Sequence, residues 1–261
     1  MSMKRIHLFE FEDYPWFSGT IRELVTDYLH YIVTTFHMYR PVIPLLKKAL
    51  KSQRFNTIID IGSGGSGPIP DILTELHKEN LGDVQIVLSD MYPHLDAFQK
   101  IQKQAPDQIT YIPHSVDARS IPEKLVGFIT FFNTFHHFKP ADAVKILQNA
   151  SRGGNGIGIF ELAGRDPITL FYIFMSPVIS CLITPFIKPR KWKRWIFTYL
   201  LPAVPFIIWW DGMVSSFRTY STEELVKLMR ETGNKDYVWK AGRIRGVLAT
   251  KITYLIGYSK I

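Results

Sequence analysis

Short apolar runs alternate with segments of helical spacing through the middle of the chain. The runs are rich in β-branched and aromatic residues, as is typical of buried strands, and lie at 57–61, 84–90, 109–112, 127–133 and 156–162. Candidate helices lie at about 68–79, 93–104 and 139–151, and further β-rich segments at about 236–241 and 247–258. This alternation predicts an α/β fold with a mostly parallel sheet and helices on both faces. Ligands of such sheets bind at the carboxyl ends of the strands, where this chain has Asp60, Asp90, Asp117, Asn133 and Glu161.

An apolar stripe at helical spacing precedes the first strand, from about Thr20 to Tyr39. Two prolines shortly after it end that helix and begin another. Because such stripes usually mark a buried face, we expect the stripe, together with Trp16 and Phe17, to lie in the core. Residues 1–54 are therefore predicted to form an N-terminal helical cap.

A glycine-rich loop follows the first strand, where residues 60–68 read Asp-Ile-Gly-Ser-Gly-Gly-Ser-Gly-Pro. Glycine allows positive φ and removes Cβ atoms, so that a ligand can lie directly on the backbone. Pro68 suits the first turn of a helix, whose free N–H groups can bind an anionic or polar ligand group. The stretch predicts a site for a nucleotide-type cofactor.

The identity of the cofactor depends on more than the glycines. Gly62, Gly64 and Gly67 match the G-x-G-x-x-G fingerprint of dinucleotide-binding proteins. Asp90, at the end of the second strand, would serve a dinucleotide equally well. The position of Asp60 inside the strand end and the long helical region before that strand favour S-adenosylmethionine (SAM) instead. A glycine-rich turn without a ligand is the structural alternative.

These motifs together resemble those of the class I SAM-dependent methyltransferases, over roughly residues 56–260. In that family a carboxylate is followed by G-x-G-x-G, and here Ser66 stands at the last expected glycine. The resemblance implies a Rossmann-like sheet of seven strands with a closing antiparallel hairpin, and SAM as cofactor. The acid after the second strand then holds the ribose, and the acid after the third lies near the adenine. The implied cofactor-binding residues are Asp60, Gly62, Ser63, Gly64, Gly67, Asp90, Met91, Asp117, Ala118 and Asn133.

A long apolar insertion follows the fifth strand. Residues 167–187 carry no charge, and as a helix they would match the ~30 Å core of a bilayer. A basic and aromatic turn at 188–195 and a second apolar run at 196–210 come next. Two interpretations stay open: a hairpin that contacts anionic head groups and the membrane interface, or a helical lid over the active site. Both predict a hydrophobic acceptor pocket.

Polar residues return after the insertion, and three of them are candidates for the acceptor site. Asp211, Arg218 and Tyr220 either orient the acceptor or tie the insertion to the catalytic domain. The structural alternative is an Asp211–Arg218 pair that braces the turn, since ion-pair networks also resemble sites. Ser221 and Glu224 then have the spacing of a capping box that opens a helix.

Two adjacent histidines are the candidates for acid–base chemistry. Methyl transfer requires an acceptor held in line with the methyl–sulfur bond, and a hydroxyl or carboxylic acid acceptor also gains from a base. His136 and His137 follow the fourth strand, and histidine titrates in the useful range. Adjacent histidines usually point apart, so we expect one to face the site; packing without a proton role is the alternative. No third ligand stands at metal-site spacing, and we expect no metal.

Composition and net charge limit the classes of binding partner that the chain suits. The chain has 261 residues, 46% of them hydrophobic, and a formal net charge of +8. This charge suits an anionic membrane leaflet or nucleic acid. The densest basic cluster lies between two apolar runs, and the Asn/Asp-Pro-Pro-aromatic motif of base methylation is absent at Asn133, so we do not expect nucleic acid. The single cysteine, Cys181, and the lack of a signal-peptide pattern predict a cytoplasmic protein at the inner face of the membrane.

The sequence therefore predicts a SAM-dependent methyltransferase that acts, preferably on oxygen, on a hydrophobic small molecule or lipid-like acceptor. The predicted domains are the cap at 1–54, the cofactor-binding domain at 55–164 and 211–261, and the insertion at 165–210. Three alternatives stay open: an NAD-type oxidoreductase, a methyltransferase acting on nucleic acid or protein, and a non-catalytic membrane-bound cofactor binder.

Overall fold

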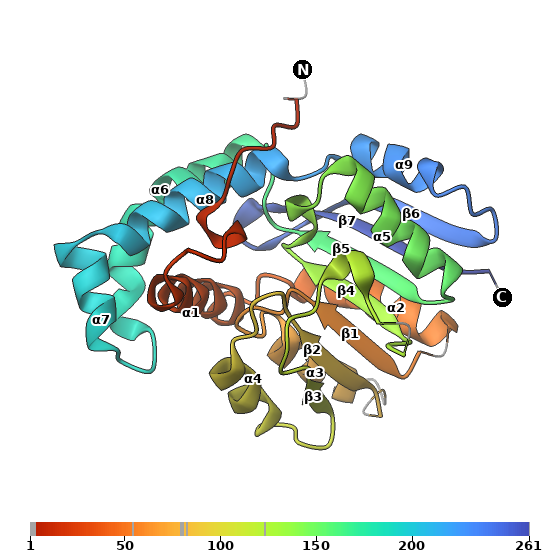
Figure 1. Cartoon of the computed structure of the whole chain (residues 1–261), viewed down its shortest axis with the longest axis horizontal. Coiled ribbons are helices and arrows are strands. Elements are labelled where there is room, and N and C mark those ends of the chain that lie inside the picture. The colour runs from red at the N-terminus through yellow and green to blue at the C-terminus, as the bar shows by residue number, and fades with distance from the viewer. Residues whose placement is uncertain (1–3, 54, 79–80, 82, 123, 261) are drawn as a thin grey trace.

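A twisted sheet forms the centre of the computed structural model, which describes residues 4–53, 55–78, 81, 83–122 and 124–260 (Figure 1). Within these residues the sheet has seven strands, ordered β3-β2-β1-β4-β5-β7-β6. The strands are β1 (Thr57–Ile61), β2 (Gln85–Ser89), β3 (Ile109–Tyr111), β4 (Phe128–Phe132), β5 (Gly156–Glu161), β6 (Tyr237–Arg245) and β7 (Lys251–Ser259). Strands β1 to β5 pair in parallel, and β7 is antiparallel to both β5 and β6. The predicted α/β class and closing hairpin are confirmed.

Helices cover both faces of the sheet (Figure 1). One face carries α2 (Ile43–Gln53), α3 (Ile69–Lys78) and α4 (Leu95–Gln102), and the other carries α5 (Pro140–Arg152) and α9 (Thr222–Glu231). The strand order reverses direction between β1 and β4, which is the point where open α/β sheets bind ligands. The predicted helices after β1, β2 and β4 are present; the predicted end at residue 79 lies outside the described residues.

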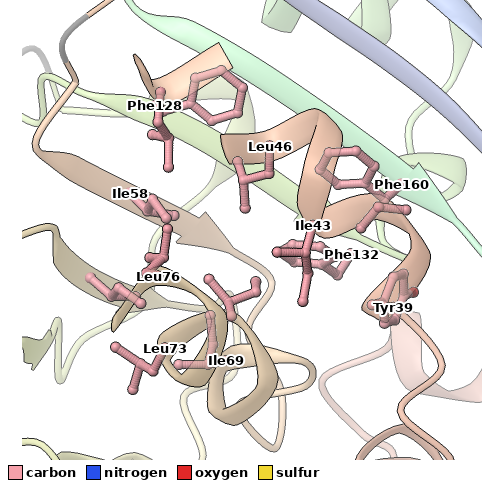
Figure 2. Packing of buried hydrophobic residues seen from close by; sticks show 14 of the residues in the cluster. Tyr39, Ile43, Leu46, Ile58, Ile69, Leu73, Leu76, Phe128, Phe132 and Phe160 are labelled. Carbon is pink, nitrogen blue, oxygen red and sulfur yellow. The ribbon is translucent and has the colours of Figure 1, made fainter. Parts of the chain in front are cut away.

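Apolar side chains from the first face interlock with the sheet (Figure 2). Ile43 and Leu46 of α2 and Leu73 of α3 pack over Ile58 of β1 and Phe132 of β4, and all five are nearly or fully buried. The strands carry apolar residues on both sides because both sides are covered, which explains their continuous apolar runs. This packing fixes the carboxyl ends of β1 and β4 next to each other.

The insertion forms a helical hairpin that projects from one end of the sheet (Figure 1). Its arms are α6 (Pro167–Ile183) and α8 (Ala203–Arg218), which pack side by side, and α7 (Trp192–Trp195) lies at the tip. A cluster of apolar residues joins α8 to α1 (Gly19–Thr35) of the N-terminal cap. Helix α8 is continuous across residue 210, so the predicted boundary between 210 and 211 falls inside a helix and the insertion extends to Arg218.

The outer side of α6 is apolar and exposed. Its exposed residues recur at helical spacing: Ile168, Phe171, Phe174, Val178, Leu182 and, just beyond the helix, Phe186. Segment Pro167–Phe186 is long and apolar enough to cross a membrane, and 22% of its most apolar 18 residues are buried. The segments Trp192–Leu200 and Ala203–Arg218 form a second, bent apolar pair, with 73° between them.

Part of the basic turn binds α1 and is not free for head groups. Lys191 Nζ lies 2.6 Å from a carboxylate oxygen of Glu23 and of Asp27, and Arg194 Nη2 lies 2.5 Å from Asp27. Arg194 is buried, so it is not available for the contact with anionic head groups that was one interpretation of the turn. These pairs fix the tip of the hairpin to the N-terminal cap.

Three expectations for the N-terminal cap and the last strand need correction. Trp16 is 67% exposed rather than part of the core, whereas Phe17 is buried as predicted. Within the stripe, Leu24 is buried, but Leu29 is exposed because it faces the cavity described below. The last strand begins at Lys251, after a short turn that occupies the first residues of the predicted strand.

Candidate active site

The loop after β1 turns back over the strand end through residues in the left-handed region. Gly62, Gly64 and Gly67 have φ of +73°, +49° and +41°. A Cβ on Gly62 would lie 2.8 Å from Thr134 Cγ2, so only glycine allows the loop to approach the end of β4 this closely. Ser66, at the last glycine of the expected pattern, has a φ of +71°. That position therefore needs the conformation that glycine adopts without strain.

Asp60 lies beneath this loop rather than inside the cavity. Its side chain is buried, and its Oδ1 accepts a hydrogen bond from Thr130 Oγ1 at 2.8 Å. Burial raises the pKa of Asp60 to about 7. Its backbone oxygen accepts hydrogen bonds from Ser63 Oγ and Ser89 Oγ. The predicted direct contact of Asp60 with a cofactor does not fit this position; Asp60 braces the loop, and Ser63 lines the cavity.

Asp90 faces the loop from the end of β2. Its Oδ2 accepts a hydrogen bond from Gly64 N, and its Oδ1 accepts one from Tyr92 N, each at 2.8 Å. Each carboxylate oxygen has a further lone pair for a ligand hydroxyl. Asp90 therefore organises two loops and still presents an acceptor surface to the cavity that it lines.

Three more predicted cofactor residues line the same cavity: Met91, Asp117 and Ala118. Met91 is largely exposed, and Ala118 is buried. Asp117 pairs with Arg119 Nη2 at 2.6 Å, and hydrogen bonds from Arg119 hold the pKa of Asp117 below its usual range. The ends of β2 and β3 thus provide a mixed polar and apolar edge, which suits a nucleoside.

Asn133 follows β4 and ties this strand to β5. It has a φ of +54°, a conformation that asparagine tolerates better than most residues. Its Oδ1 accepts hydrogen bonds from Leu162 N at 3.1 Å and Ala163 N at 2.9 Å. Asn133 lines the cavity directly beside the glycine loop.

A cavity of about 1670 Å³ lies over the carboxyl edge of the sheet. This volume exceeds the usual 300–1,000 Å³ or so of a single-ligand pocket and leaves room for a cofactor and an acceptor together. Residues 7–17, helix α1 and the inner sides of α6 and α8 close it from above. From α6 the lining residues are Thr169, Tyr172, Ile173, Ser176 and Ile179. The insertion therefore covers the cavity, as expected of a lid.

His136 is held by Glu161 at the end of β5. His136 Nδ1 lies 2.6 Å from Glu161 Oε2, and both side chains are buried. Because a carboxylate only accepts hydrogen bonds, Nδ1 carries a proton, and in the neutral imidazole Nε2 is then the atom with the free lone pair. The other oxygen of Glu161 accepts a hydrogen bond from Phe135 N at 2.8 Å, which fixes the pair. His136 Nε2 has no hydrogen-bond partner within the described part of the chain, and His136 lines the cavity.

His137 has a different environment, although it does not point away from its neighbour. The two imidazole rings stack, with centroids 4.4 Å apart, which corrects the expectation that they diverge. His137 Nδ1 lies 2.8 Å from Asp13 Oδ1. Burial acts to lower the pKa of His137, but the carboxylates of Glu10 and Asp13 outweigh it and raise this pKa to about 9. At neutral pH His137 is therefore a cation.

Glu10 lies between the two histidines and Arg218. Its carboxylate oxygens lie 3.8 Å from His136 Nε2, 3.7 Å from His137 Nε2 and 3.1 Å from Arg218 Nη1. Together with the two histidines, Glu10 forms a set of three residues of metal-ligating type that the sequence did not reveal. One ligand atom from each of the three lies within 4.8 Å of the others. However, the guanidinium of Arg218 already provides a fixed positive charge at this carboxylate. We therefore assign no metal to the cluster.

The three residues after the insertion have separate roles. Arg218 binds the N-terminal segment: Nη2 lies 2.6 Å from Asp13 Oδ2, and the guanidinium also donates to the backbone oxygen of Leu8. Asp211 accepts hydrogen bonds from the backbone N–H of Phe11 at 2.9 Å and of its neighbour at 3.3 Å. Both residues line the cavity, but they bind this segment rather than each other.

Tyr220 does not line the cavity, and of its two expected roles this position favours tying the insertion to the catalytic domain over orienting the acceptor. Its hydroxyl donates to the backbone oxygen of Phe138 at 2.7 Å, and Arg5 stacks over its ring at 4.0 Å. Burial raises the pKa of Tyr220 to about 12. Tyr220 therefore supports the segment that carries the histidines.

Sequence reasoning missed Glu10 and Asp13 as site residues. They lie in the stretch 9–17, where the aromatic residues suggested a core. The available signal was the presence of three acids within this aromatic stretch, because buried charged residues are rare unless they are paired.

Comparison with solved protein structures identifies proteins that share this fold. None of the protein-family models matches the sequence, and no curated protein sequence does. The plantazolicin methyltransferase in complex with SAH has a TM-score of 0.60 and 12% identity, over 94% of this chain and 93% of that one. Human N-acetylserotonin methyltransferase in complex with SAM has a TM-score of 0.53 and 11% identity, over 94% and 57%. The mitomycin 7-O-methyltransferase has a TM-score of 0.51 and 11% identity, over 85% and 54%.

The fold of the chain is therefore that of the class I SAM-dependent methyltransferases, as the sequence motifs predicted. At these identities the likeness concerns the fold. The chain spans little more than half the length of several of the solved structures that it matches, such as 56% of an O-methyltransferase family protein from Burkholderia thailandensis.

Proposed function

We propose that the chain is a SAM-dependent methyltransferase that methylates an oxygen of a hydrophobic small molecule or lipid-like acceptor. The observation that carries this proposal is the buried His136–Glu161 pair, whose histidine lines the same cavity as the glycine loop. A base next to a cofactor site has a clear use in O-methylation, because the acceptor hydroxyl must lose its proton.

The described residues fit SAM as the cofactor. The loop exposes backbone at Gly62 and Gly64, and Asp90 offers carboxylate oxygens to ribose hydroxyls. Asp117 and Ala118 lie where an adenine edge would follow the ribose. Two solved structures with this fold contain SAM or SAH, which supports the same choice.

The proposed mechanism divides the work between cofactor and protein. When bound, SAM supplies a methyl group that is already activated by its positive sulfur. The protein holds the acceptor oxygen in line with that methyl group and excludes water, which is the main contribution in such reactions. With SAM bound, His136 Nε2 would take the hydroxyl proton while the acceptor oxygen gains the methyl group and the methyl–sulfur bond breaks, and Glu161 would stabilise the resulting imidazolium.

A hydrophobic acceptor is favoured by the wall that the insertion provides. The α6 residues Tyr172, Ile173 and Ile179 line the cavity, together with Ile208 of α8 and Phe17 of the N-terminal segment. An apolar molecule that buries its surface against them gains roughly 25 cal/mol per Å². Its polar end then points to the histidines.

Methyl-labelled SAM tests this function. The protein is incubated with it and a whole-cell extract, and the products are partitioned; we expect label in the organic phase. His136→Gln should lower the labelling by about 100-fold or more, the usual contribution of a general base, and should leave SAH binding unchanged. His114→Gln, an exposed histidine outside the cavity wall, is the matched control. Label on nucleic acid or protein would refute the proposed hydrophobic acceptor. A protein that binds NAD but not SAH would support the alternative of an oxidoreductase.

We also propose that the insertion binds the anionic inner face of the cytoplasmic membrane. The exposed stripe of α6 continues to the tip, where Trp192, Trp195 and Tyr199 are exposed. Lys188, Arg190 and Lys193 are exposed beside them. Aromatic residues between an apolar face and basic side chains are typical of the membrane interface, and each basic residue near an anionic surface contributes about 1 kcal/mol.

Vesicle co-sedimentation tests this contact. The protein should bind vesicles that contain phosphatidylglycerol more strongly than vesicles of phosphatidylcholine alone, and salt should weaken the binding. Phe174→Glu with Leu182→Glu should abolish it, whereas Val126→Glu, at an exposed apolar residue outside the hairpin, should not. Equal sedimentation of both variants would show that α6 does not carry the contact.

A further inference from the structure

Three buried polar atoms without hydrogen-bond partners meet beside His136. They are His136 Nε2, Glu10 Oε1 and Arg218 Nη1, and none of them has a partner within the described residues. Their side chains are only 1–2% exposed, and all three residues line the cavity. Glu10 Oε1 lies 3.1 Å from Arg218 Nη1, close enough for an ion pair but without a hydrogen bond. Because buried polar atoms in native proteins nearly always have a partner, this cluster indicates a ligand.

The hydrogen-bonding capacity of the cluster defines that ligand. With Nδ1 donating to Glu161, His136 Nε2 accepts in the neutral imidazole, and the carboxylate oxygen of Glu10 also accepts. Arg218 Nη1 donates. A single alcohol satisfies His136 with its proton and Arg218 with its lone pair, and it leaves Glu10 without a donor. A second donor is needed, and a donor on a neighbouring atom of the ligand can reach Glu10, because the two accepting atoms lie 3.8 Å apart.

We infer that the acceptor carries two adjacent hydrogen-bond donors: the hydroxyl that is methylated and a second hydroxyl or amine beside it. This inference rests on the proposed function, because it assumes that the cavity holds the methyl acceptor. His136 takes the proton of the first donor, Arg218 donates to the oxygen of that same hydroxyl, and Glu10 binds the second donor. Glu10 is therefore the residue that distinguishes such an acceptor from a simple alcohol or phenol.

A matched set of amphiphiles tests this specificity. The probes are 4-octylcatechol, 4-octylphenol and 2-amino-4-octylphenol, titrated by calorimetry into protein saturated with SAH. 4-Octylcatechol should bind roughly 10- to 100-fold more tightly than 4-octylphenol, the usual effect of a hydrogen bond to a buried charged group. The aminophenol shows whether the second donor is a hydroxyl or an amine, and tight binding of either supports the inference.

Glu10→Gln identifies the residue responsible. It should reduce the ratio between catechol and phenol to about one, because a neutral amide replaces the carboxylate with little change in shape. SAH affinity and the circular dichroism spectrum check that this variant is folded. Glu231→Gln, an exposed glutamate outside the cavity wall, should retain the ratio.

The outcomes separate this inference from the proposed function. If the wild-type protein binds the catechol and aminophenol no better than the phenol, or binds none of the probes, the inference is wrong; this comparison needs no variant. Preservation of the ratio in folded Glu10→Gln would also overturn it. If the ratio depends on Glu10 but labelled SAM transfers no methyl group to any probe, the donor pair stands and the methyltransferase proposal fails. If catechol and phenol are methylated equally, the methyltransferase proposal stands and the inference of a second donor is wrong.

Discussion

Removal of Arg218 should destabilise the protein strongly, although the residue lies at the end of a surface hairpin. In Arg218→Met the side chain keeps its length and loses its charge. Its guanidinium is 2% exposed, lies 3.1 Å from Glu10 and donates to Asp13 at 2.6 Å. The substitution therefore removes the nearer of two cations from the buried carboxylate of Glu10, which keeps only His137 at 3.7 Å, and it removes a charge-assisted hydrogen bond to Asp13.

The size of the effect follows from these contacts. Breaking a buried ion pair by removing one partner typically costs about 3–5 kcal/mol. For a domain of this size each kcal/mol lowers the melting temperature by roughly 2–4 °C, so we expect a fall of about 6–20 °C. The free energy of unfolding can be measured by urea denaturation at pH 7, followed by tryptophan fluorescence. The loss of unfolding free energy caused by Arg218→Met should be nearly the same with and without SAH, since Arg218 is not in the glycine loop.

A double-mutant cycle with Glu10→Gln provides the decisive comparison. The neutral amide removes the uncompensated charge, so Arg218→Met with Glu10→Gln should be more stable than the sum of the two single effects predicts. The coupling should be at least about 1 kcal/mol, because the two atoms are in contact. Strict additivity, or a loss below about 1 kcal/mol in Arg218→Met, would refute the view that this pair holds the N-terminal segment in place.

Three further predictions concern the cofactor loop and the histidines. Gly62→Ala should lower both stability and SAH affinity, because a side chain at φ +73° costs about 1–2 kcal/mol and its Cβ would meet Thr134; thermal unfolding and calorimetry measure the two effects, and unchanged values would contradict the loop geometry. Asp90→Ala should weaken SAM binding by about 100-fold, since it removes a charged acceptor whose hydrogen bonds contribute about 1.5–3 kcal/mol each. Calorimetric titration measures the affinity, and circular dichroism checks that the variant is folded. An unchanged affinity would disprove the site assignment. The pKa of His137 is raised to about 9 from an ordinary 6.5, so its stabilisation is complete below pH 6.5 and is lost as the pH rises through 9. Urea titrations of the wild type and His137→Gln from pH 6 to 10 should converge at the high end, and a constant difference would show that the charge of His137 does not contribute.

The cofactor half of the site could be predicted because its determinants are local in sequence. The glycine loop, its strand and its helix are consecutive, and each obeys a short-range rule about φ or about helix starts. Even the departure from the pattern at Ser66 has a local explanation, since its φ of +71° is the conformation that glycine supplies in the expected motif. The sequence could not show that Asp60 lies behind the loop, because a strand-end carboxylate can point either into the cavity or behind the loop.

The acceptor half could not be predicted in the same way, because its residues come from distant parts of the chain. Asp13 is 124 residues from His137 and 205 from Arg218, and no local rule links these positions. The aromatic residues around Glu10 indicated only a buried segment. The basic turn was interpreted from its composition alone, and its partners on α1 became evident only in three dimensions.

This separation has a consequence for how the protein folds. Paired strands in the parallel part of the sheet are at most 70 residues apart, as at Asp60 and Thr130. The cluster around Arg218, which is the proposed acceptor cluster, instead requires Asp13 to meet the last residue of α8, 205 residues away. Contacts between such distant segments close a long loop, and their entropic cost must be met before they contribute stability. We expect the cofactor site to form first and the acceptor cluster last. A chain still attached to the ribosome, or one that has lost its first residues, would then bind SAM before it could select an acceptor.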